Sequence, residues 1–293
     1  MRVFITGASG HIASAVVPEL LRAGHQVVGL ARSDASAAAV KGLGAEVRRG
    51  DLSHLDGLRD AAADADAVIS LAFNHDTVAA GDMAGAAAGE RAAVMAFGDA
   101  LAGTGKTLMV VGWGRTGDAG VDATLDANPR TATARLVDGY AERGIRTVLV
   151  AIPPVVHGDR DRAGFIPTLI GLARRTGVSG YAGDGANRWC AAHAGDIGTL
   201  YRLALEKAPS GSQLYAASED GVPVREIAEH IGRHLGLPTA SIPEERRAEH
   251  FGYFAPLITM DVPVCSAATR ELLGWSPSGP LLLDDIDAGH YFS

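Results

Sequence analysis

Small residues near the start of the chain have the spacing of a phosphate-binding loop. Residues 6–13 read TGASGHIA, between the apolar stretch Val3–Thr6 and a segment with helical periodicity. In such a loop Gly7 permits a tight turn, and Gly10 lets the backbone approach a pyrophosphate that also meets the N–H groups of the following helix. Ala13 takes the third position, where a methyl group is tolerated between helix and strand. The loop predicts a dinucleotide site, and its predicted contacts are Gly7, Ser9, Gly10, His11 and Ile12.

The end of the second predicted strand carries the residues that would choose between NAD and NADP. This strand ends at Ala31 and is followed by Arg32, Ser33 and Asp34. An acidic side chain here accepts hydrogen bonds from the adenosine ribose, whereas an arginine pairs with a 2′-phosphate and stacks on adenine. Arg32 and Ser33 therefore predict NADP(H) as the preferred cofactor, and Asp34 keeps NAD(H) open.

Two further strand ends supply predicted contacts for the adenosine half of the cofactor. Asp51 and Leu52 follow the third strand, where a carboxylate can accept a hydrogen bond from the adenine amino group. Leu71, Ala72 and Phe73 stand at the end of the fourth strand, against the expected position of the adenosine ribose. These assignments depend on the nucleotide-binding unit that the glycine loop predicts.

Strand and helix patterns alternate along the first half of the chain. The strand-like segments are Val3–Thr6, Gln26–Ala31, Glu46–Arg49, Ala67–Ala72, Thr107–Val111 and Arg146–Ile152. The helical segments are His11–Ala23, Ala35–Leu43, Leu55–Ala63, Ala84–Leu101 and Thr131–Arg143. Residues 112–128 are rich in Gly and Asp and are predicted to form a loop. Repeated βα units with short connections predict an α/β fold, a doubly wound parallel sheet of the Rossmann type with helices on both faces.

The pattern changes after Ile152, where two prolines break the strand. We expect the Rossmann core to cover residues 1–152 and to continue over about 187–220, where a helix and one more strand follow. Residues 153–186 and 221–293 are expected to form a small C-terminal substrate lobe, with two helices beyond Pro223. Such a lobe would close over the carboxyl ends of the strands, where ligands of doubly wound sheets bind.

Segments along the whole chain resemble the short-chain dehydrogenase/reductase superfamily, on its extended and atypical side, alongside NAD-dependent epimerase/dehydratases. The matching segments are TGASGHI at 6–12, LARSD at 30–34, RGDL at 49–52, SLAF at 70–73, PPVVHG at 153–158, GDGANRW at 183–189, HAGD at 193–196 and RELLGW at 270–275. The resemblance implies a Rossmann core, a NAD(P) cofactor and a substrate cleft beneath the C-terminal lobe. It also implies that the backbone around Pro154 and Val156 faces the nicotinamide carboxamide.

The residues that usually carry out the chemistry of this superfamily are missing. A tyrosine acts there as general acid or base, a lysine four residues later lowers its pKa and holds the ribose, and a serine orients the carbonyl. No tyrosine of this chain has a lysine four residues later, and the lysines are Lys41, Lys106 and Lys207. Gly112 or Trp113 takes the expected position of the serine. The usual alcohol–ketone mechanism is therefore not supported.

Several side chains could take over part of this chemistry, and each also has a structural explanation. His75 follows the fourth strand and could titrate near neutral pH, or hydrogen-bond the backbone of its loop. Trp113 could stack on an aromatic substrate or pack in the core, and Thr133 could bind a carbonyl or cap a helix. Tyr181 could reach the cleft from the lobe, and Arg130 or a water could replace the missing acid.

Composition limits the partners of the chain. Of its 293 residues, 47% are hydrophobic and 20% are charged, and the formal net charge is −8 without a basic cluster. We therefore expect a globular protein with a small-molecule substrate and no nucleic acid or membrane partner. Cys190 and Cys265 fit no metal-ligand spacing, so we expect no metal site. No leader is recognised, which predicts a cytoplasmic protein, and a homodimer through the helices at 84–101 and 131–143 would suit the resemblance.

Three functions remain compatible with these patterns. We favour an NADPH-dependent oxidoreductase of atypical mechanism, because a two-lobed cleft is typical of a small-molecule site. Most aromatic residues of the C-terminal lobe should be core, but a few could line a pocket for an apolar or aromatic substrate. The alternatives are a redox-sensing or regulatory protein that binds NADP(H) without turnover, and a proton-transfer enzyme such as an isomerase or cyclase.

Overall fold

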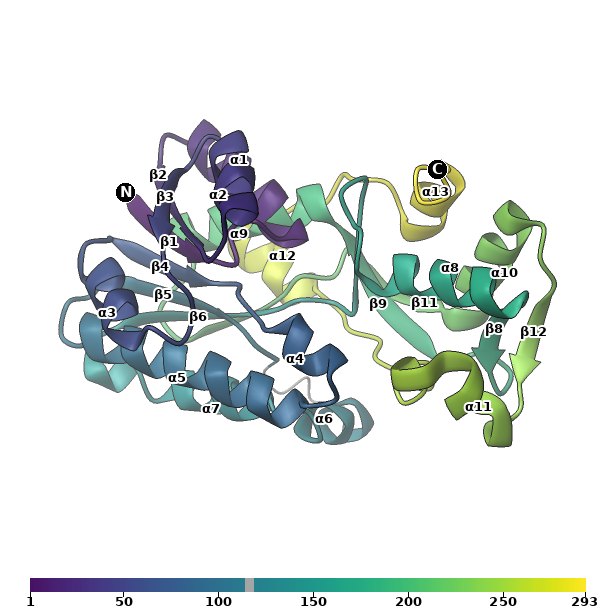
Figure 1. The fold of residues 1–293 in the computed structure, drawn as a ribbon. Coiled ribbons are helices and arrows are strands. Elements are labelled where there is room, and N and C mark those ends of the chain that lie inside the picture. Colours follow the sequence, from purple (N-terminus) through teal and green to yellow (C-terminus); the bar gives the residue numbers. More distant parts are fainter. Residues whose placement is uncertain (114–118) are drawn as a thin grey trace. The chain divides into compact units, whose positions relative to one another are not determined.

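In the part of the chain that the structure describes, residues 1–113 and 119–293, seven parallel strands form the sheet of a first unit (Figure 1). A computed structural model places them in the order β10-β6-β5-β4-β1-β2-β3, and every neighbouring pair is parallel. The strands are β1 (Arg2–Thr6), β2 (Gln26–Ala31), β3 (Glu46–Arg49), β4 (Ala67–Ser70), β5 (Thr107–Val111), β6 (Arg146–Ala151) and β10 (Ser212–Tyr215). The order reverses between β1 and β4, and ligands of doubly wound sheets bind at such a reversal.

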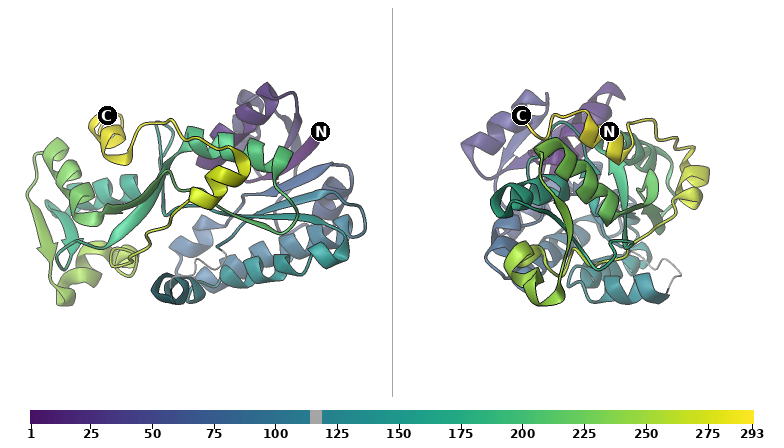
Figure 2. Two further views of the ribbon diagram at one scale, coloured as in Figure 1. Left: turned by 180° about the vertical axis from the view of Figure 1, so that it is seen from behind. Right: turned by 90° about the vertical axis from the view of Figure 1, so that its right-hand side faces the viewer.

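Helices cover both faces of this sheet, as the two opposite views show (Figures 1 and 2). One face carries α3 (Leu55–Ala63), α5 (Met83–Leu101) and α7 (Thr131–Asp138), and the other carries α1 (His11–Arg22), α2 (Asp34–Gly42) and α9 (Ala194–Lys207). Phe4 of β1 meets Phe97 of α5 edge to face at 6.2 Å in the buried core of the first face. This is the predicted Rossmann arrangement. No helix in the described ranges is long and apolar enough to cross a membrane.

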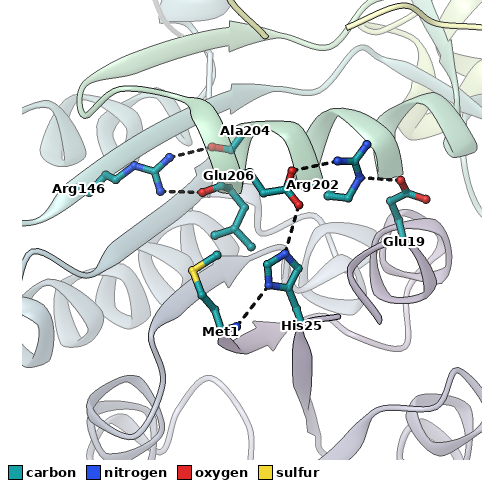
Figure 3. A network of polar contacts seen from close by, with 8 residues as sticks. Met1, Glu19, His25, Arg146, Arg202, Ala204 and Glu206 are labelled. Atoms are coloured by element: carbon teal, nitrogen blue, oxygen red, sulfur yellow. Dashed lines mark hydrogen bonds and ion pairs between the residues drawn. The ribbon is translucent and has the colours of Figure 1, made fainter. Parts of the chain in front are cut away.

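Ion pairs and hydrogen bonds fix α9 to the sheet and to α1 (Figure 3). Arg202 Nε lies 2.9 Å from Glu19 Oε1 of α1, and Arg202 Nη1 lies 2.9 Å from Glu206 Oε2. Arg146 of β6 donates to three carbonyl groups at the end of α9, of which that of Ala204 also accepts from the Ala208 N–H. These carbonyls belong to Ala204, Leu205 and Ala208. Residues 197–215 therefore belong to the first unit.

The chain divides into two compact units. The first comprises residues 1–152, 197–215 and 268–275, and the second comprises residues 153–196, 216–267 and 276–293. The sequence pattern assigns residues 187–196 and 216–220 to the core and residues 268–275 to the lobe, whereas the structure places the first two ranges in the second unit and the last range in the first unit. The reason is that β9 (Arg188–His193) pairs with strands of the second unit, β7 (Val155–His157) and β11 (Glu219–Pro223).

Within the described residues of the second unit, the strands form a three-stranded sheet and a parallel pair. The sheet has the order β11-β9-β7, and β8 (Ser179–Ala182) pairs with β12 (Thr239–Ile242). Around them lie α8 (Phe165–Thr176), α10 (Val224–Leu235), α11 (Glu244–Phe251), η2 (Gly252–Phe254) and α13 (Leu282–Asp287). Phe165 meets Trp189 at 5.1 Å and Phe254 at 4.8 Å, both edge to face. Trp189 and Phe254 lie in the core of the unit, and Phe165 packs against it. Of the aromatic residues expected in the core of the lobe, Phe251, Phe254 and Tyr291 are buried, whereas Tyr253 is exposed.

A buried pair holds the C-terminal segment of the second unit to β7. His157 is fully buried, and its Nδ1 lies 2.8 Å from Asp285 Oδ2 in α13. The Tyr291 hydroxyl accepts a hydrogen bond from the Gly158 N–H at 3.0 Å. Burial by itself would raise the pKa of Asp285, but the hydrogen bond and charge of His157 outweigh it, so that the pKa is lowered. The carboxylate is therefore ionised in the folded protein at neutral pH.

Three predicted segments differ in the structure. The predicted loop at 112–128 contains α6 (Ala119–Asp126), and residues 114–118 lie outside the described residues. The predicted helix at 131–143 ends at Asp138, is followed by Gly139 and resumes as the short turn η1 (Ala141–Arg143), because glycine is a poor helix former. Beyond Pro223 the described residues form four α-helices instead of two, since α12 (Ala267–Leu273) and α13 are too short for a clear periodicity.

Candidate functional site

The loop between β1 and α1 closes tightly against the end of β4. Gly7 has a φ of +69°, which favours glycine, and a Cβ there would lie 2.8 Å from the Ala72 nitrogen. The Ala72 N–H donates to the Thr6 hydroxyl at 3.2 Å, and the Gly10 N–H donates to the Gly7 carbonyl at 2.9 Å. The structure thus brings together Gly7, Gly10 and Ala72, three of the predicted cofactor contacts, beside the reversal of strand order.

The first turn of α1 can receive an anion. Gly10 is its N-cap residue, and no side chain of the described residues caps the helix there. The first N–H groups of a helix have no partner within the helix, and its dipole favours negative charge at this end. Ser9 is exposed, and His11 and Ile12 are half-buried in the same turn. This end of α1 therefore has the chemistry that a pyrophosphate needs.

Two arginines lie where the neighbouring second and third strands end. Arg32 follows β2, and its Nη2 lies 2.8 Å from Asp76 Oδ2. Arg49 is the last residue of β3, in register with Ala31, and it forms an ion pair with Asp34. Neither ion pair was predicted, because the partners are 44 and 15 residues apart and no motif links them. Each arginine is thus paired with a carboxylate at the predicted position of the adenosine ribose.

The remaining polar residues of this edge are held by local hydrogen bonds. The Ser33 hydroxyl accepts from the Ser36 N–H at 3.2 Å and caps α2. The Asp51 carboxylate accepts from the Ser53 hydroxyl at 2.6 Å and from the Ser53 N–H at 2.7 Å. These two hydrogen bonds lower the pKa of Asp51, and the bond from the Ser53 hydroxyl has the larger effect. Asp51 is therefore an ionised acceptor, and Leu52 beside it is half-buried against the core.

A buried ion pair stands near the end of β4. Glu90 of α5 is 3% exposed, and Arg130, which directly precedes α7, is 26% exposed. Arg130 Nη2 lies 2.5 Å from Glu90 Oε1, and Arg130 Nε lies 3.1 Å from Oε2. The guanidinium also lies over the Phe73 ring, 4.2 Å from its centroid. Glu90 was missed in the sequence, although a carboxylate in the middle of an Ala-rich helix was the available signal. The pair fixes a positive charge next to predicted cofactor contacts.

The candidates His75 and Trp113 lie at the same edge of the sheet. His75 opens α4 (His75–Ala79), and its ring meets Phe73 edge to face at 5.5 Å. Loss of hydration lowers the pKa of His75, and the charge of Arg130 lowers it further. The ring is therefore neutral at neutral pH. Trp113 follows β5, is half-buried and meets Tyr215 of β10 at 6.5 Å, so at least one edge of its ring is used in packing.

Three hydroxyl groups on or directly after the helices α7 and α9 are buried. Thr133 of α7 is 1% exposed, so its side chain does not face solvent. Tyr140 follows α7 and is 3% exposed, with its ring packed so closely on Gly98 that a Cβ there would overlap it. Tyr201 of α9 is fully buried, and burial raises its pKa. None of these three hydroxyls is therefore presented as a ready proton donor.

The other predicted site residues belong to the second unit. Tyr181 of β8 is half-buried, and the Arg225 guanidinium lies 5.8 Å from the centroid of its ring. Pro154 directly precedes β7, and Val156 is the middle residue of that strand. Their roles, like those of the predicted contacts in the first unit, stay predictions.

Comparisons with known proteins agree with this fold. A model of an NAD(P)H-binding family matches residues 7–152. An uncharacterised protein of Saccharomyces cerevisiae is 39% identical over 303 residues, which cover 99% of each chain. The 2'-dehydrokanamycin reductase of Streptomyces kanamyceticus is 30% identical over 259 residues, which cover 85% of this chain and 71% of that protein.

A solved structure shows the same architecture along the whole chain. UDP-glucuronic acid 4-epimerase from Bacillus cereus, in complex with UDP-glucuronic acid and NAD, superposes with a TM-score of 0.74 at 18% identity, covering 99% of this chain and 98% of the epimerase. At this identity the likeness concerns the fold alone. Together with the glycine loop, the family model and the relatives show that the chain belongs to the NAD(P)H-binding family. Its fold, with this order of parallel strands, is that of the extended short-chain dehydrogenases/reductases, which include the NAD-dependent epimerases and dehydratases.

Proposed function

We propose that the protein is an NADP(H)-dependent oxidoreductase that acts on a small molecule without the usual tyrosine and lysine. The observation that carries this proposal is the first turn of α1, which no side chain of the described residues caps and which stands beside the tight Gly7 turn. A side-chain cap would compete with a phosphate for the same N–H groups. The loop is therefore closely shaped at Gly7, and its N-cap glycine has no side chain that would compete with a pyrophosphate.

The preference for NADP(H) rests on Arg32 and Arg49. Both lie at the ends of neighbouring strands, and an arginine binds a phosphate through two parallel hydrogen bonds. Asp34, the residue that kept NAD(H) open, is paired with Arg49 and is thereby less suited to accept hydrogen bonds from a ribose. Asp51 would accept from the adenine amino group. NAD(H) remains the alternative cofactor.

The reacting end would be organised by Arg130. When bound, NADPH supplies a hydride. An arginine side chain donates hydrogen bonds but does not act as a proton donor in proteins, so Arg130 would orient an acceptor and the proton would come from elsewhere. Glu90 balances the charge of Arg130, so the pair would attract a neutral oxygen or nitrogen acceptor better than it would attract an anion. His75, neutral and next to Phe73, is the titratable group nearest to this pair among our candidates.

The direction of the reaction is suggested by one relative. The similar protein from Streptomyces kanamyceticus is named a reductase of 2'-dehydrokanamycin, which is a small molecule. This supports a reductase acting on a small molecule. The apolar or aromatic character of the substrate stays a prediction.

Calorimetric titration of cofactor-stripped protein with NADPH, NADP⁺, NADH and NAD⁺ tests the proposal. We expect NADPH to bind at least tenfold more tightly than NADH, and Arg32→Ala to weaken NADPH binding by about tenfold to a hundredfold, as for the loss of a charge-assisted contact. NADPH oxidation is then followed with ketones, activated alkenes and iminium salts. Binding without oxidation of NADPH would favour the redox-sensing alternative, and no binding of any cofactor would refute the proposal.

A further inference from the structure

The ion pair between Arg32 and Asp76 links two segments that are far apart in sequence. Arg32 stands at the end of β2, and Asp76 lies in the first turn of α4, which follows β4. Their closest atoms, Nη2 and Oδ2, are 2.8 Å apart, and the side chains are 64% and 78% exposed. Both residues belong to the first unit. The carboxylate of Asp76 therefore occupies one donor group of the arginine that the proposed function assigns to the 2′-phosphate.

The charges around Arg32 are balanced before any cofactor binds. Arg32 is paired with Asp76, and Arg49 on the neighbouring strand is paired with Asp34. A 2′-phosphate carries between one and two negative charges at neutral pH. It would meet two carboxylates as well as two guanidinium groups, and it would compete with Asp76 for the N–H groups of Arg32 Nη2. The ribose hydroxyl of NADH carries no charge and has little need of that donor.

We propose that Asp76 sets the cofactor selectivity of this protein by competing with the 2′-phosphate of NADP(H) for Arg32. The inference rests on the proposed function, because it assumes that NADP(H) binds at the end of β2. Asp76 lowers the affinity for NADPH and leaves that for NADH nearly unchanged. It thereby keeps the preference for NADPH smaller than Arg32 and Arg49 would otherwise produce.

The strength of the pair makes this competition measurable. An exposed ion pair contributes little in water, so breaking it weakens phosphate binding only about twofold to fivefold. The displaced carboxylate still lies near the phosphate, and this repulsion is screened over about 10 Å at 0.1 M salt. Removing the charge of Asp76 should therefore strengthen NADPH binding about threefold to tenfold at low salt. The gain should shrink as salt is added.

The test compares Asp76→Asn with the wild type by calorimetry, using NADPH, NADH and adenosine 2′,5′-bisphosphate. The bisphosphate reports on the adenosine end alone. Asp76→Glu keeps the charge and should behave as the wild type. Asp99→Asn is the matched control, since Asp99 also forms an exposed ion pair, with Arg143, and lies near the C-terminal end of α5. The double variant Arg32→Ala/Asp76→Asn shows whether the gain passes through Arg32. Thermal unfolding verifies that every variant is folded.

The expected result is tighter binding of NADPH and of the bisphosphate by Asp76→Asn, with less than a twofold change for NADH and for Asp99→Asn. In the Arg32→Ala background the gain should fall below twofold. Unchanged or weaker NADPH binding by Asp76→Asn would overturn the role of Asp76, while the proposed function would stand if Arg32→Ala still lost affinity. An equal gain in NADH affinity would also overturn the role of Asp76, because the gain would then not depend on the 2′-phosphate. If neither the wild type nor Asp76→Asn binds NADPH, both proposals are refuted.

Discussion

Glu90 and Arg130 form a buried ion pair, and we expect the loss of Arg130 to reduce the stability of the protein more than the loss of Glu90. The Glu90 side chain is 3% exposed and that of Arg130 is 26% exposed. Arg130→Met leaves a carboxylate without its cation in the interior, whereas Glu90→Gln leaves a guanidinium that water can still reach. The two single variants and the double variant form a thermodynamic cycle around this contact.

The burial of each partner sets the size of the two effects. Breaking a buried pair by removing one partner costs about 3–5 kcal/mol, which is the loss of unfolding free energy that we expect for Arg130→Met at pH 7. A glutamine side chain would keep the shape of Glu90 and one acceptor oxygen, so Glu90→Gln should cost about 1–2 kcal/mol. In the double variant no buried charge remains. It should therefore be at least about 1 kcal/mol more stable than Arg130→Met alone.

Urea unfolding followed by circular dichroism at pH 7 and pH 5 measures these differences. The loss for Arg130→Met should shrink at pH 5, since the unpaired carboxylate can then take up a proton. The reasoning would be refuted if the two single variants lost equal stability, or if the double variant were less stable than Arg130→Met. Either result would mean that Glu90 is not held as a buried anion by Arg130.

Two further predictions concern the glycine loop and the second unit. Gly7→Ala should weaken NADPH binding at least tenfold in the calorimeter, because its Cβ would lie 2.8 Å from the Ala72 nitrogen. Gly24→Ala is the control, since Gly24 has a similar φ of +83° but nothing within 4 Å of the added Cβ, and it should leave NADPH binding unchanged. Equal losses of affinity in the two variants would contradict the steric argument. Asp285→Ala leaves His157 without its buried partner and should lower stability by about 3 kcal/mol at pH 7. Because the folded pKa of Asp285 is lowered, this stabilisation is complete above the unfolded value near 4 and is lost as the pH falls through the folded value. The difference between wild type and variant should therefore narrow below pH 4, and a constant difference in unfolding free energy would contradict it.

Local patterns were sufficient to predict the elements that build the cofactor end of the first unit. The strands Gln26–Ala31 and Glu46–Arg49 and the helix Leu55–Ala63 have the predicted bounds. Their periodicity is clear and their ends are set by neighbouring glycines and polar residues. Around Gly139 the same reasoning failed, since periodicity continued through a residue that ends α7. The short helix α6 was not predicted, because the Gly and Asp residues of this region indicated a loop.

The site was less predictable because its ion pairs join distant segments. Arg32 was identified from its position after a strand, but its partner Asp76 is 44 residues away. Arg130 was considered as a substitute acid, yet Glu90, 40 residues before it, gives the arginine its fixed place. Such pairs depend on which strands become neighbours in the sheet. A single sequence shows the residue types of the pair but not the contact.

The groups gathered around Phe73 can hold charge more readily than they can release a proton. Arginine side chains in general do not release a proton in proteins, and loss of hydration lowers the pKa of His75. A ketone accepts a proton on oxygen as it is reduced, so here that proton would have to come from water while Arg130 stabilises the oxygen. An iminium ion becomes a neutral amine by hydride addition alone and needs no acid. In the proposed reductase such a substrate would therefore need no acid, whereas a ketone would use the donor groups of Arg130.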